Sequence, residues 1–250
     1  MNDTIAKPAD YGIDAPRIVR NLGLVGIGVP MLGIVTSRPL ARAHRVLAVI
    51  VLVYGLMAGA SCLLTAMLIV WTSKVGKLRA RDRLLDTIPW RGDEMVLDVG
   101  PGRGLLLIGA AKRLRTGKAI GADIWRDEDQ SGNRPEATWI NARAEGVADR
   151  IDLKDGDVRH LPLGDETCDV VVSSLTLHNI GSKAERAQAV REIARVLKPG
   201  GRLALLDFRH TDDYARVLSD AGWRDVRRSG RQFLPVPVRT VTAIKPTDGR

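Results

Sequence analysis

The chain contains few of the residues that build disulfide frameworks or metal centres. Among its 250 residues there are only two cysteines, Cys62 and Cys168, and four histidines that lie far apart in the sequence. Two cysteines cannot form a disulfide framework, and neither they nor the histidines have the spacing of zinc ligands. The sequence therefore predicts no metal site.

Charge is missing from one long stretch near the N-terminus. Residues 46–71 carry no charged side chain, and a helix of that length measures about 39 Å, more than a hydrocarbon core of about 30 Å. We interpret this stretch as a transmembrane helix with Trp71 at the interface. On it, Gly55 and Gly59 have the spacing of a close helix contact. The end of the helix is expected in the cytoplasm, because basic residues follow at once: Lys74, Lys77, Arg79, Arg81 and Arg83.

A shorter apolar stretch precedes this helix. Residues 22–35 contain four glycines and Pro30, and the stretch becomes long enough to span a bilayer only if residues 20–37 are included. We expect a second transmembrane helix over 20–37 that forms a hairpin with the first, and a re-entrant or interfacial segment is the alternative. The expected connecting turn contains three basic residues, which are unusual on the outer side of a membrane: Arg38, Arg42 and Arg45.

The rest of the chain contains a glycine-rich loop. Residues 96–104 read Val-Leu-Asp-Val-Gly-Pro-Gly-Arg-Gly, an apolar run that closes on three glycines. This pattern predicts a strand, a tight loop and then a helix over 105–115, whose N-terminal N–H groups face a polar ligand. A dinucleotide fingerprint would need glycine where Leu105 stands, and no Gly-Lys-Ser/Thr follows. A pyrophosphate clamp is therefore disfavoured, and a P-loop is excluded.

The loop resembles the cofactor loop of the class I S-adenosyl-L-methionine (SAM) dependent methyltransferases. In that family an acidic residue and then a small or apolar residue precede Gly-x-Gly-x-Gly. The resemblance implies that Asp98, together with Gly100, Pro101, Gly102 and Gly104, holds the amino-acid end of SAM. For the loop taken alone, a glycine-rich turn without a ligand is the alternative.

Two later acidic residues extend the resemblance. A second apolar strand over 119–124 ends in Asp123, which follows Gly104 at the distance expected for one intervening helix. Residues 126–138 are interpreted as a lid over the site or as a plain surface loop. The resemblance assigns the ribose hydroxyls to Asp123 and the adenine to Ile124, Trp125, Asp157 and Val158. For Asp157, a solvated loop aspartate is the alternative.

A further polar cluster follows a run of strand formers. Residues 168–173 lack alternation, which is typical of a strand buried on both faces of a parallel sheet. Ser174, His178 and Asn179 follow at its C-terminal end, where ligands bind in open α/β sheets. We expect Ser174 to lie near the methionine end of SAM. His178 is the first candidate for a general base and Asn179 the second, while a histidine that only packs or binds backbone is the alternative.

The next segments continue this pattern. Ser182 and Glu185 form a capping box for a helix, and residues 198–201, Lys-Pro-Gly-Gly, turn the chain into a strand over 202–208. Thr211 is the expected cap of the following helix. This part of the chain resembles the corresponding stretch of the ubiquinone/menaquinone C-methyltransferases.

Together these elements predict an α/β fold. We expect a Rossmann-like seven-stranded sheet of the class I methyltransferase type with helices on both faces, preceded by one or two transmembrane helices. The expected parts are a membrane region over residues 1–71, a basic linker helix over 72–90 and a methyltransferase domain over 91–250.

The resemblance implies a SAM-dependent methyltransferase, and the membrane region implies an enzyme of the cell membrane with its catalytic domain in the cytoplasm. The expected acceptor is a small lipophilic molecule such as a quinone precursor, an isoprenoid or a polar lipid, with membrane lipid as a further contact. Residues 1–83 carry +7 of the net charge of +9, which disfavours a nucleic-acid partner of the catalytic domain. The alternatives are a methyltransferase for a soluble small molecule or for nucleic acid, and a non-catalytic SAM-binding membrane adaptor.

Overall fold

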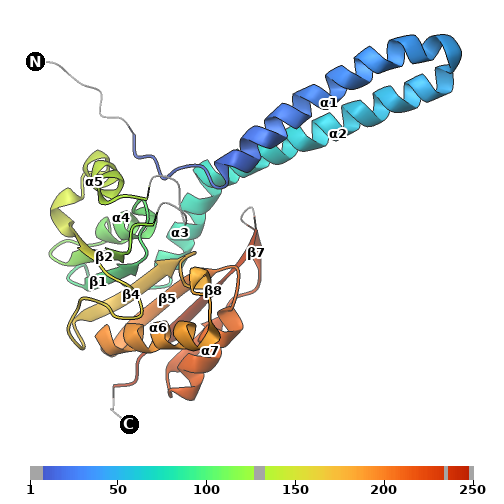
Figure 1. Ribbon diagram of the computed structural model, residues 1–250. Coiled ribbons are helices and arrows are strands. Elements are labelled where there is room, and N and C mark those ends of the chain that lie inside the picture. The colour runs from blue at the N-terminus through green and yellow to red at the C-terminus, as the bar shows by residue number, and fades with distance from the viewer. Residues whose placement is uncertain (1–7, 127–132, 234–235, 248–250) are drawn as a thin grey trace, which may run out of the picture. The chain divides into compact units, whose positions relative to one another are not determined.

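The computed structural model describes residues 8–126, 133–233 and 236–247. These residues belong to two compact units (Figure 1). One unit, Gly12–Lys77, contains a helical hairpin, and the other, an α/β unit, comprises Met1–Tyr11 and Leu78–Arg250.

The hairpin consists of α1 (Pro16–Ala43) and α2 (Arg45–Trp71), which are separated only by His44. Both helices are long and apolar enough to cross a membrane, by length and composition. Helix α1 is longer than the expected range 20–37. The three arginines expected in the connecting turn therefore lie within helices, because Arg38 and Arg42 are in the last turns of α1 and Arg45 begins α2.

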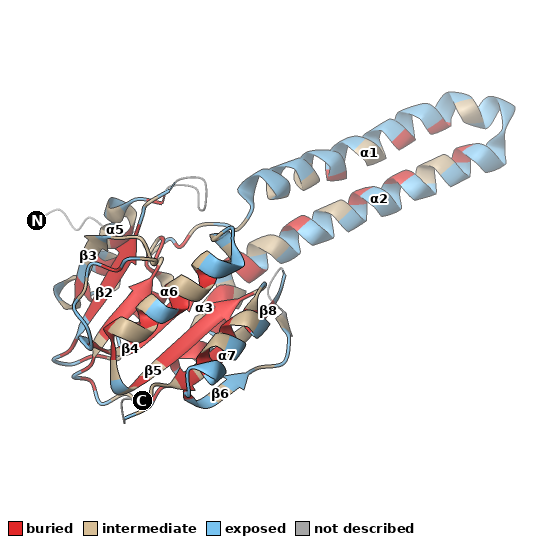
Figure 2. Ribbon diagram, turned by 60° about the horizontal axis from the view of Figure 1, so that its bottom comes forward, coloured by how far each residue is buried: buried red, intermediate tan, exposed pale blue. Residues whose placement is uncertain are grey.

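The two helices meet along a seam of small residues. A Cβ atom on Gly33 would lie 3.7 Å from the Cα of Gly55, and one on Gly59 would lie only 2.2 Å from Cγ of Pro30. The predicted contact face at Gly55 and Gly59 is thus confirmed, and it packs the two helices of one chain together. Figure 2 shows burial confined to this seam. The large apolar side chains of both helices face outward, with exposed fractions of up to 75% for Val46.

The base of the hairpin is tied by polar contacts. The ammonium of Lys77 donates to the carbonyl of Gly12 at 2.7 Å and contacts the carboxylate of Asp14 at 3.3 Å. The backbone N–H of Asp14 donates to Oγ of Ser73 at 2.9 Å. Ser73 lies in a π-helical turn, η1 (Thr72–Gly76), which connects α2 to α3 (Lys77–Leu85). The expected linker helix over 72–90 is therefore helical only as far as Leu85.

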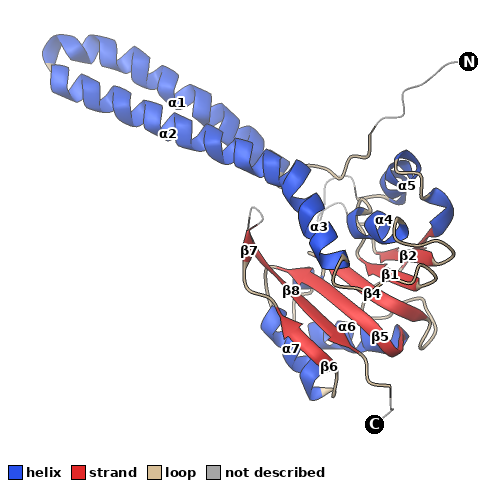
Figure 3. Ribbon diagram, turned by 180° about the vertical axis from the view of Figure 1, so that it is seen from behind, coloured by secondary structure: helices blue, strands red, loops and turns tan. Residues whose placement is uncertain are grey.

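The α/β unit is built on a mixed sheet (Figure 3). Its strand order is β3-β2-β1-β4-β5-β8-β6, the first five strands are parallel, and β8 is antiparallel to both of its neighbours. The predicted seven-stranded sheet is confirmed, and a two-residue strand β7 also pairs with β8. The strands are β1 (Met95–Val99), β2 (Lys118–Asp123), β3 (Ile151–Asp155), β4 (Cys168–Ser174), β5 (Leu197–Asp207), β6 (Arg224–Arg228), β7 (Gln232–Phe233) and β8 (Pro237–Ile244).

Helices cover both faces of the sheet because its central strands are apolar on both sides. Val96 of β1 packs on the face covered by α3, α4 and α5, whereas its neighbour Leu97 packs on the face covered by α6 and α7. The chain order reverses between β1 and β4, which is the point where open α/β sheets bind ligands beyond the carboxyl ends of their strands. These helices are α4 (Leu105–Ala111), α5 (Pro135–Ala144), α6 (Lys183–Val196) and α7 (Thr211–Asp220).

Several predicted boundaries are corrected. Helix α4 ends at Ala111 instead of residue 115, because the N–H groups of residues 115–117 donate to the carbonyl of Gly92. His210, with a φ of 59°, takes the cap position expected of Thr211. Part of the loop predicted over 126–138 is helical, since α5 begins at Pro135, and residues 127–132 of it lie outside the described residues. The capping box of Ser182 and Glu185 is confirmed.

Candidate functional site

The glycine-rich loop joins β1 to α4 in a backbone conformation that requires glycine. Gly100, Gly102 and Gly104 have φ values of 69°, 55° and 86°. A Cβ atom on Gly100 would lie 2.3 Å from the side chain of Thr176, and one on Gly104 would lie 2.8 Å from Cγ2 of Thr138. The three glycines thus allow both the left-handed turns and the close packing of this loop.

Asp98 is a buried carboxyl group without a partner. Its exposed fraction is 1%, and within the described residues neither of its oxygens accepts a hydrogen bond. Burial raises the pKa of Asp98 to about 8, the nearby backbone N–H of Leu107 opposes the shift, and the charge of Asp123 adds to it. Such an orphaned group fits a ligand that brings a positive charge, as the ammonium group of SAM does.

Asp123 connects the glycine loop to the loop after β2. It is 8% exposed, and its two oxygens accept from the N–H of Gly102 at 3.2 Å and from the N–H of Trp125 at 2.8 Å. Trp125 has a positive φ of 54°, and its indole N–H donates to Asp155 at the end of β3. Ile124, between the two, is 43% exposed. Three of the predicted cofactor residues therefore lie together beside the loop.

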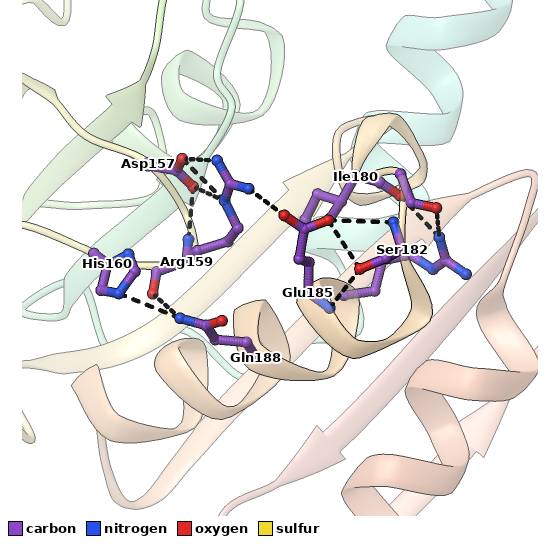
Figure 4. Close-up of polar contacts among 9 residues, drawn as sticks. Asp157, Arg159, His160, Ile180, Ser182, Glu185 and Gln188 are labelled. Atoms are coloured by element: carbon purple, nitrogen blue, oxygen red, sulfur yellow. Dashed lines mark hydrogen bonds and ion pairs between the residues drawn. The ribbon is translucent and has the colours of Figure 1, made fainter.

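Asp157 belongs to a different polar cluster (Figure 4). Arg159 donates to it four times, from Nε to both carboxylate oxygens at 3.0 Å, from Nη2 to Oδ2 at 2.5 Å and from its backbone N–H at 2.9 Å. These hydrogen bonds lower the pKa of Asp157. The same guanidinium donates to Glu185 at 2.6 Å, whose carboxylate accepts from Ser182 at the start of α6. Sequence reasoning missed Arg159, although an arginine two residues after an aspartate is a visible signal.

This pairing affects the role predicted for Asp157. A carboxylate has about four acceptor positions, and Arg159 approaches both of its oxygens. An adenine amino group would therefore share these oxygens with Arg159 or displace it. Val158, the next predicted residue, is partly buried against the apolar cluster that includes α6.

His178 lies against a buried carboxylate at the end of β5. Its Nδ1 atom is 2.9 Å from Oδ1 of Asp207, and its backbone N–H donates to Oδ2 of Asp207 at 3.1 Å. Asp207 is 2% exposed and also accepts from the N–H of Phe208 at 2.8 Å and from the hydroxyl of Tyr214 at 3.4 Å. The centroid of the Phe208 ring lies 4.3 Å from the centroid of the His178 ring. Sequence reasoning missed Asp207, which is 29 residues away in the chain.

The other residues predicted at the end of β4 lie on either side of Thr176. Thr176 donates to the carbonyls of Gly100 at 3.2 Å and of Ser174 at 3.1 Å, so this strand end contacts the glycine loop. Ser174 is partly buried, and Asn179 is exposed at the end of a short 3-10 turn, η3 (Leu177–Asn179). Among the residues that the structure describes, no group of three or more His, Cys, Asp or Glu side chains could hold a metal ion.

The strand order and the glycine-rich loop between β1 and α4 define a Rossmann-like fold of the methyltransferase type. Residues 97–205 match the family model of the methyltransferase domain. A SAM-dependent methyltransferase from Aquifex aeolicus has the same fold, with a TM-score of 0.53, 21% identity and coverage of 67% of this chain and 90% of that chain. Over residues 97–205 the chain is therefore similar to methyltransferase domains, and the solved structure shows the same fold.

Curated relatives match the same region. The chain is 38% identical over 118 residues to a demethylmenaquinone methyltransferase of Lactiplantibacillus plantarum, which covers 47% of this chain and 46% of the relative. It is 32% identical over 161 residues to the 27-O-demethylrifamycin SV methyltransferase of Amycolatopsis mediterranei, which covers 63% of this chain and 54% of the relative. The chain thus spans about half the length of these relatives.

Proposed function

We propose that this chain is a membrane-anchored methyltransferase that transfers the methyl group of SAM to a small lipophilic acceptor, with a quinone-type ring as the favoured class. One observation carries the proposal. The chain that contains the glycine-rich loop also forms a helical hairpin whose large apolar side chains face outward. In a soluble protein such a surface would be costly, whereas in a bilayer it is favourable.

The charge pattern supports insertion of the hairpin. Helix α1 has 17 uncharged residues between Arg20 and Arg38, a length of about 26 Å, and the arginine side chains can reach the two interfaces of a core of about 30 Å. No acidic residue occurs over residues 15–81. We place the end that leads into the methyltransferase domain in the cytoplasm, because Lys74 and the basic residues of α3 follow α2 there.

The cofactor roles follow from the chemistry of each group. Asp98 would bind the ammonium group of SAM, and the backbone at Gly100, Pro101, Gly102 and Gly104 would surround its amino-acid end, near Ser174. Asp123 would accept the ribose hydroxyls at the acceptor positions that the N–H groups of Gly102 and Trp125 leave open. SAM supplies an electrophilic methyl group. The adenine would be bound by Ile124, Trp125, Asp157 and Val158.

We propose His178 as the general base, positioned by Asp207. Nδ1 lies 2.9 Å from the buried carboxylate but not in hydrogen-bond geometry, and a proton placed on Nδ1 beside this carboxylate would leave Nε2 as the acceptor. Asp207 would then stabilise the positive charge that forms when Nε2 takes a proton from the acceptor. The tilted ring of Phe208 packs against the imidazole of His178. Asn179 is exposed and outside this pair, so it remains the second candidate.

The acceptor class rests on the membrane hairpin and on the relatives. One relative is named for a demethylmenaquinone and another for a 27-O-demethylrifamycin, so both names point to small-molecule acceptors. A hairpin in the bilayer would keep the catalytic domain beside the phase in which such an acceptor is dissolved.

The test is a transfer assay with the full chain in detergent micelles. Methyl-labelled SAM is incubated with a total membrane lipid extract and, separately, with a pool of water-soluble metabolites. We expect label in the lipid fraction, in a compound that absorbs as a quinone or quinol. Label only in water-soluble products would refute the lipophilic acceptor, and SAM binding without any transfer would favour the adaptor.

A further inference from the structure

We propose that residues 8–11, which we call the N-terminal strap, lock the glycine loop in its cofactor-binding conformation. The strap would act as a positioning segment without contact to SAM. This inference deepens the proposed function, because it rests on SAM binding at the glycine loop. It assigns to the segment leading into the hairpin a part in cofactor affinity.

Asn141 of α5 holds the strap and the loop with one side chain. Its Oδ1 accepts from the backbone N–H of Asp10 at 2.8 Å, and its Nδ2 donates to the carbonyl of Asp10 at 3.0 Å and to the carbonyl of Arg103 at 2.9 Å. Asn141 is 2% exposed. A buried amide that binds both partners makes the position of the loop depend on that of the strap.

Arg103 closes the same contact from the loop side. It stands between Gly102 and Gly104, and its Nε donates to the carbonyl of Asp10 at 2.8 Å while its guanidinium contacts the carboxylate of Asp10 at 3.3 Å. One residue earlier, the carbonyl of Gly102 accepts from Thr138 of α5 at 2.6 Å. The side of the loop opposite to Asp123 is therefore fixed by α5 and by the strap.

Tyr11 anchors the end of the strap. It is 7% exposed within the apolar cluster that includes α3 and α4, and its hydroxyl donates to Glu145 at 3.2 Å. Burial raises the pKa of Tyr11, and the charge of Glu145 adds to this, so the phenol remains a donor. Glu145 is itself paired with Lys112. The strap is thus built into the α/β unit.

The strap matters for SAM because glycines hold the loop only weakly by themselves. A glycine reaches left-handed and right-handed conformations with similar ease, so a loop with three of them loses much conformational entropy when it binds a ligand. Contacts that fix the loop beforehand lower this cost and raise affinity. By linkage, SAM must then stabilise the strap as much as the strap favours SAM.

The first experiment compares two arginine variants of the full chain in detergent micelles. Arg103→Gln removes the contacts of the Arg103 side chain with the strap and leaves those of Asn141, and Arg143→Gln, at an exposed position on α5, makes the same charge change as a matched control. Binding of S-adenosylhomocysteine is measured by calorimetry. We expect Kd to rise about tenfold for Arg103→Gln and to stay within twofold for Arg143→Gln, while kcat at saturating SAM is unchanged in both.

The second experiment uses the wild-type chain, so that misfolding of a variant cannot affect it. Hydrogen exchange of the Asp10 amide, which donates to Asn141, is measured with and without S-adenosylhomocysteine. We expect saturating ligand to slow this exchange about tenfold.

The outcomes separate the two proposals. A wild-type chain that binds neither SAM nor S-adenosylhomocysteine would refute the proposed function and the strap with it. Normal binding by the wild type, with unchanged Kd in Arg103→Gln or unchanged exchange of the Asp10 amide, would overturn the strap alone. A lower melting temperature of Arg103→Gln with unchanged Kd would show a purely structural role.

Discussion

Asp98→Asn should make the ligand-free protein more stable and the SAM complex weaker. In the folded state burial raises the pKa of Asp98 from 3.8 to about 8, so the unfolded chain binds fewer protons than the folded chain between these values. Stability must therefore fall as pH rises from about 4 to about 8. At pH 7 the loss amounts to at most about 4 kcal/mol, at ~1.4 kcal/mol for each tenfold change in proton affinity.

An asparagine does not ionise and removes this loss. The neutral carboxyl group and the amide are both without partners in the site, so their burial costs largely cancel, and we expect a net gain of about 2 kcal/mol at pH 7. For a domain of this size that is a rise in Tm of roughly 4–8 °C. The gain should become small near pH 4 and vanish below about pH 3, where Asp98 is protonated in both states.

The cost should appear in ligand binding. Removing one partner of a buried charge pair costs about 2–5 kcal/mol of binding free energy. In the wild type, about 1.4 kcal/mol of this is offset by the cost of ionising Asp98 at pH 7. We therefore expect SAM to bind about 3- to 400-fold more weakly to Asp98→Asn. The wild type should release close to one proton when it binds SAM at pH 7, and the variant should not.

The assay uses tryptophan fluorescence to follow thermal unfolding of the full chain in detergent between pH 4 and pH 8, and calorimetry in two buffers of different ionisation enthalpy to count protons. Asp152→Asn is the matched control, because Asp152 is exposed on β3 of the same sheet. An Asp98→Asn protein with no pH-dependent gain in Tm, or with wild-type SAM affinity, would show that Asp98 is not an orphaned buried group that binds the cofactor.

Three further predictions concern the general base His178, the bridge that Arg159 forms between Asp157 and Glu185, and the helical hairpin. His178→Ala should lower kcat at least 100-fold and change the Kd of SAM less than twofold in a labelled-methyl assay, and equal losses of both would remove the assignment of the base. Arg159→Gln should raise the pKa of Asp157 and lower Tm, less so at high salt, and an unchanged Tm would mean that the bridge to α6 is not formed in solution. Gly59→Leu should destabilise the hairpin by about 1–3 kcal/mol, seen as a lower α1–α2 crosslinking yield between introduced cysteines. Gly28→Leu should leave that yield unchanged, because a Cβ atom there would come within 4 Å of no atom elsewhere in the described chain.

The parts of the site that sequence could predict are those encoded by local spacing. The glycine loop, the strand before it and Asp123 are recognisable because each depends on residues a few positions apart. Asp207 and Arg159 were missed because their partners are set by side-chain direction and by strand order. The contact between Asn141 and Asp10 joins residues 131 positions apart, and no local pattern indicates it.

The fold shows the same division. Strand types and the helix of Ser182 and Glu185 follow from periodicity and capping. The sequence predicts a loop where α5 begins because the acidic and glycine-rich residues before Pro135 hide the helix start, although proline at a first helical position is a usual signal. The end of α4 depends on the carbonyl of Gly92, which is distant in sequence from the helix start.

The glycine seam of the hairpin has a consequence for biosynthesis. Helix α1 has a short uncharged stretch interrupted by glycines and Pro30, and its seam residues gain close contact only after α2 is beside it. The more apolar α2 leaves the ribosome later. If the hairpin is inserted as we propose, the two helices would enter the bilayer as one unit, because the single residue between them leaves no loop that could separate their insertion in time.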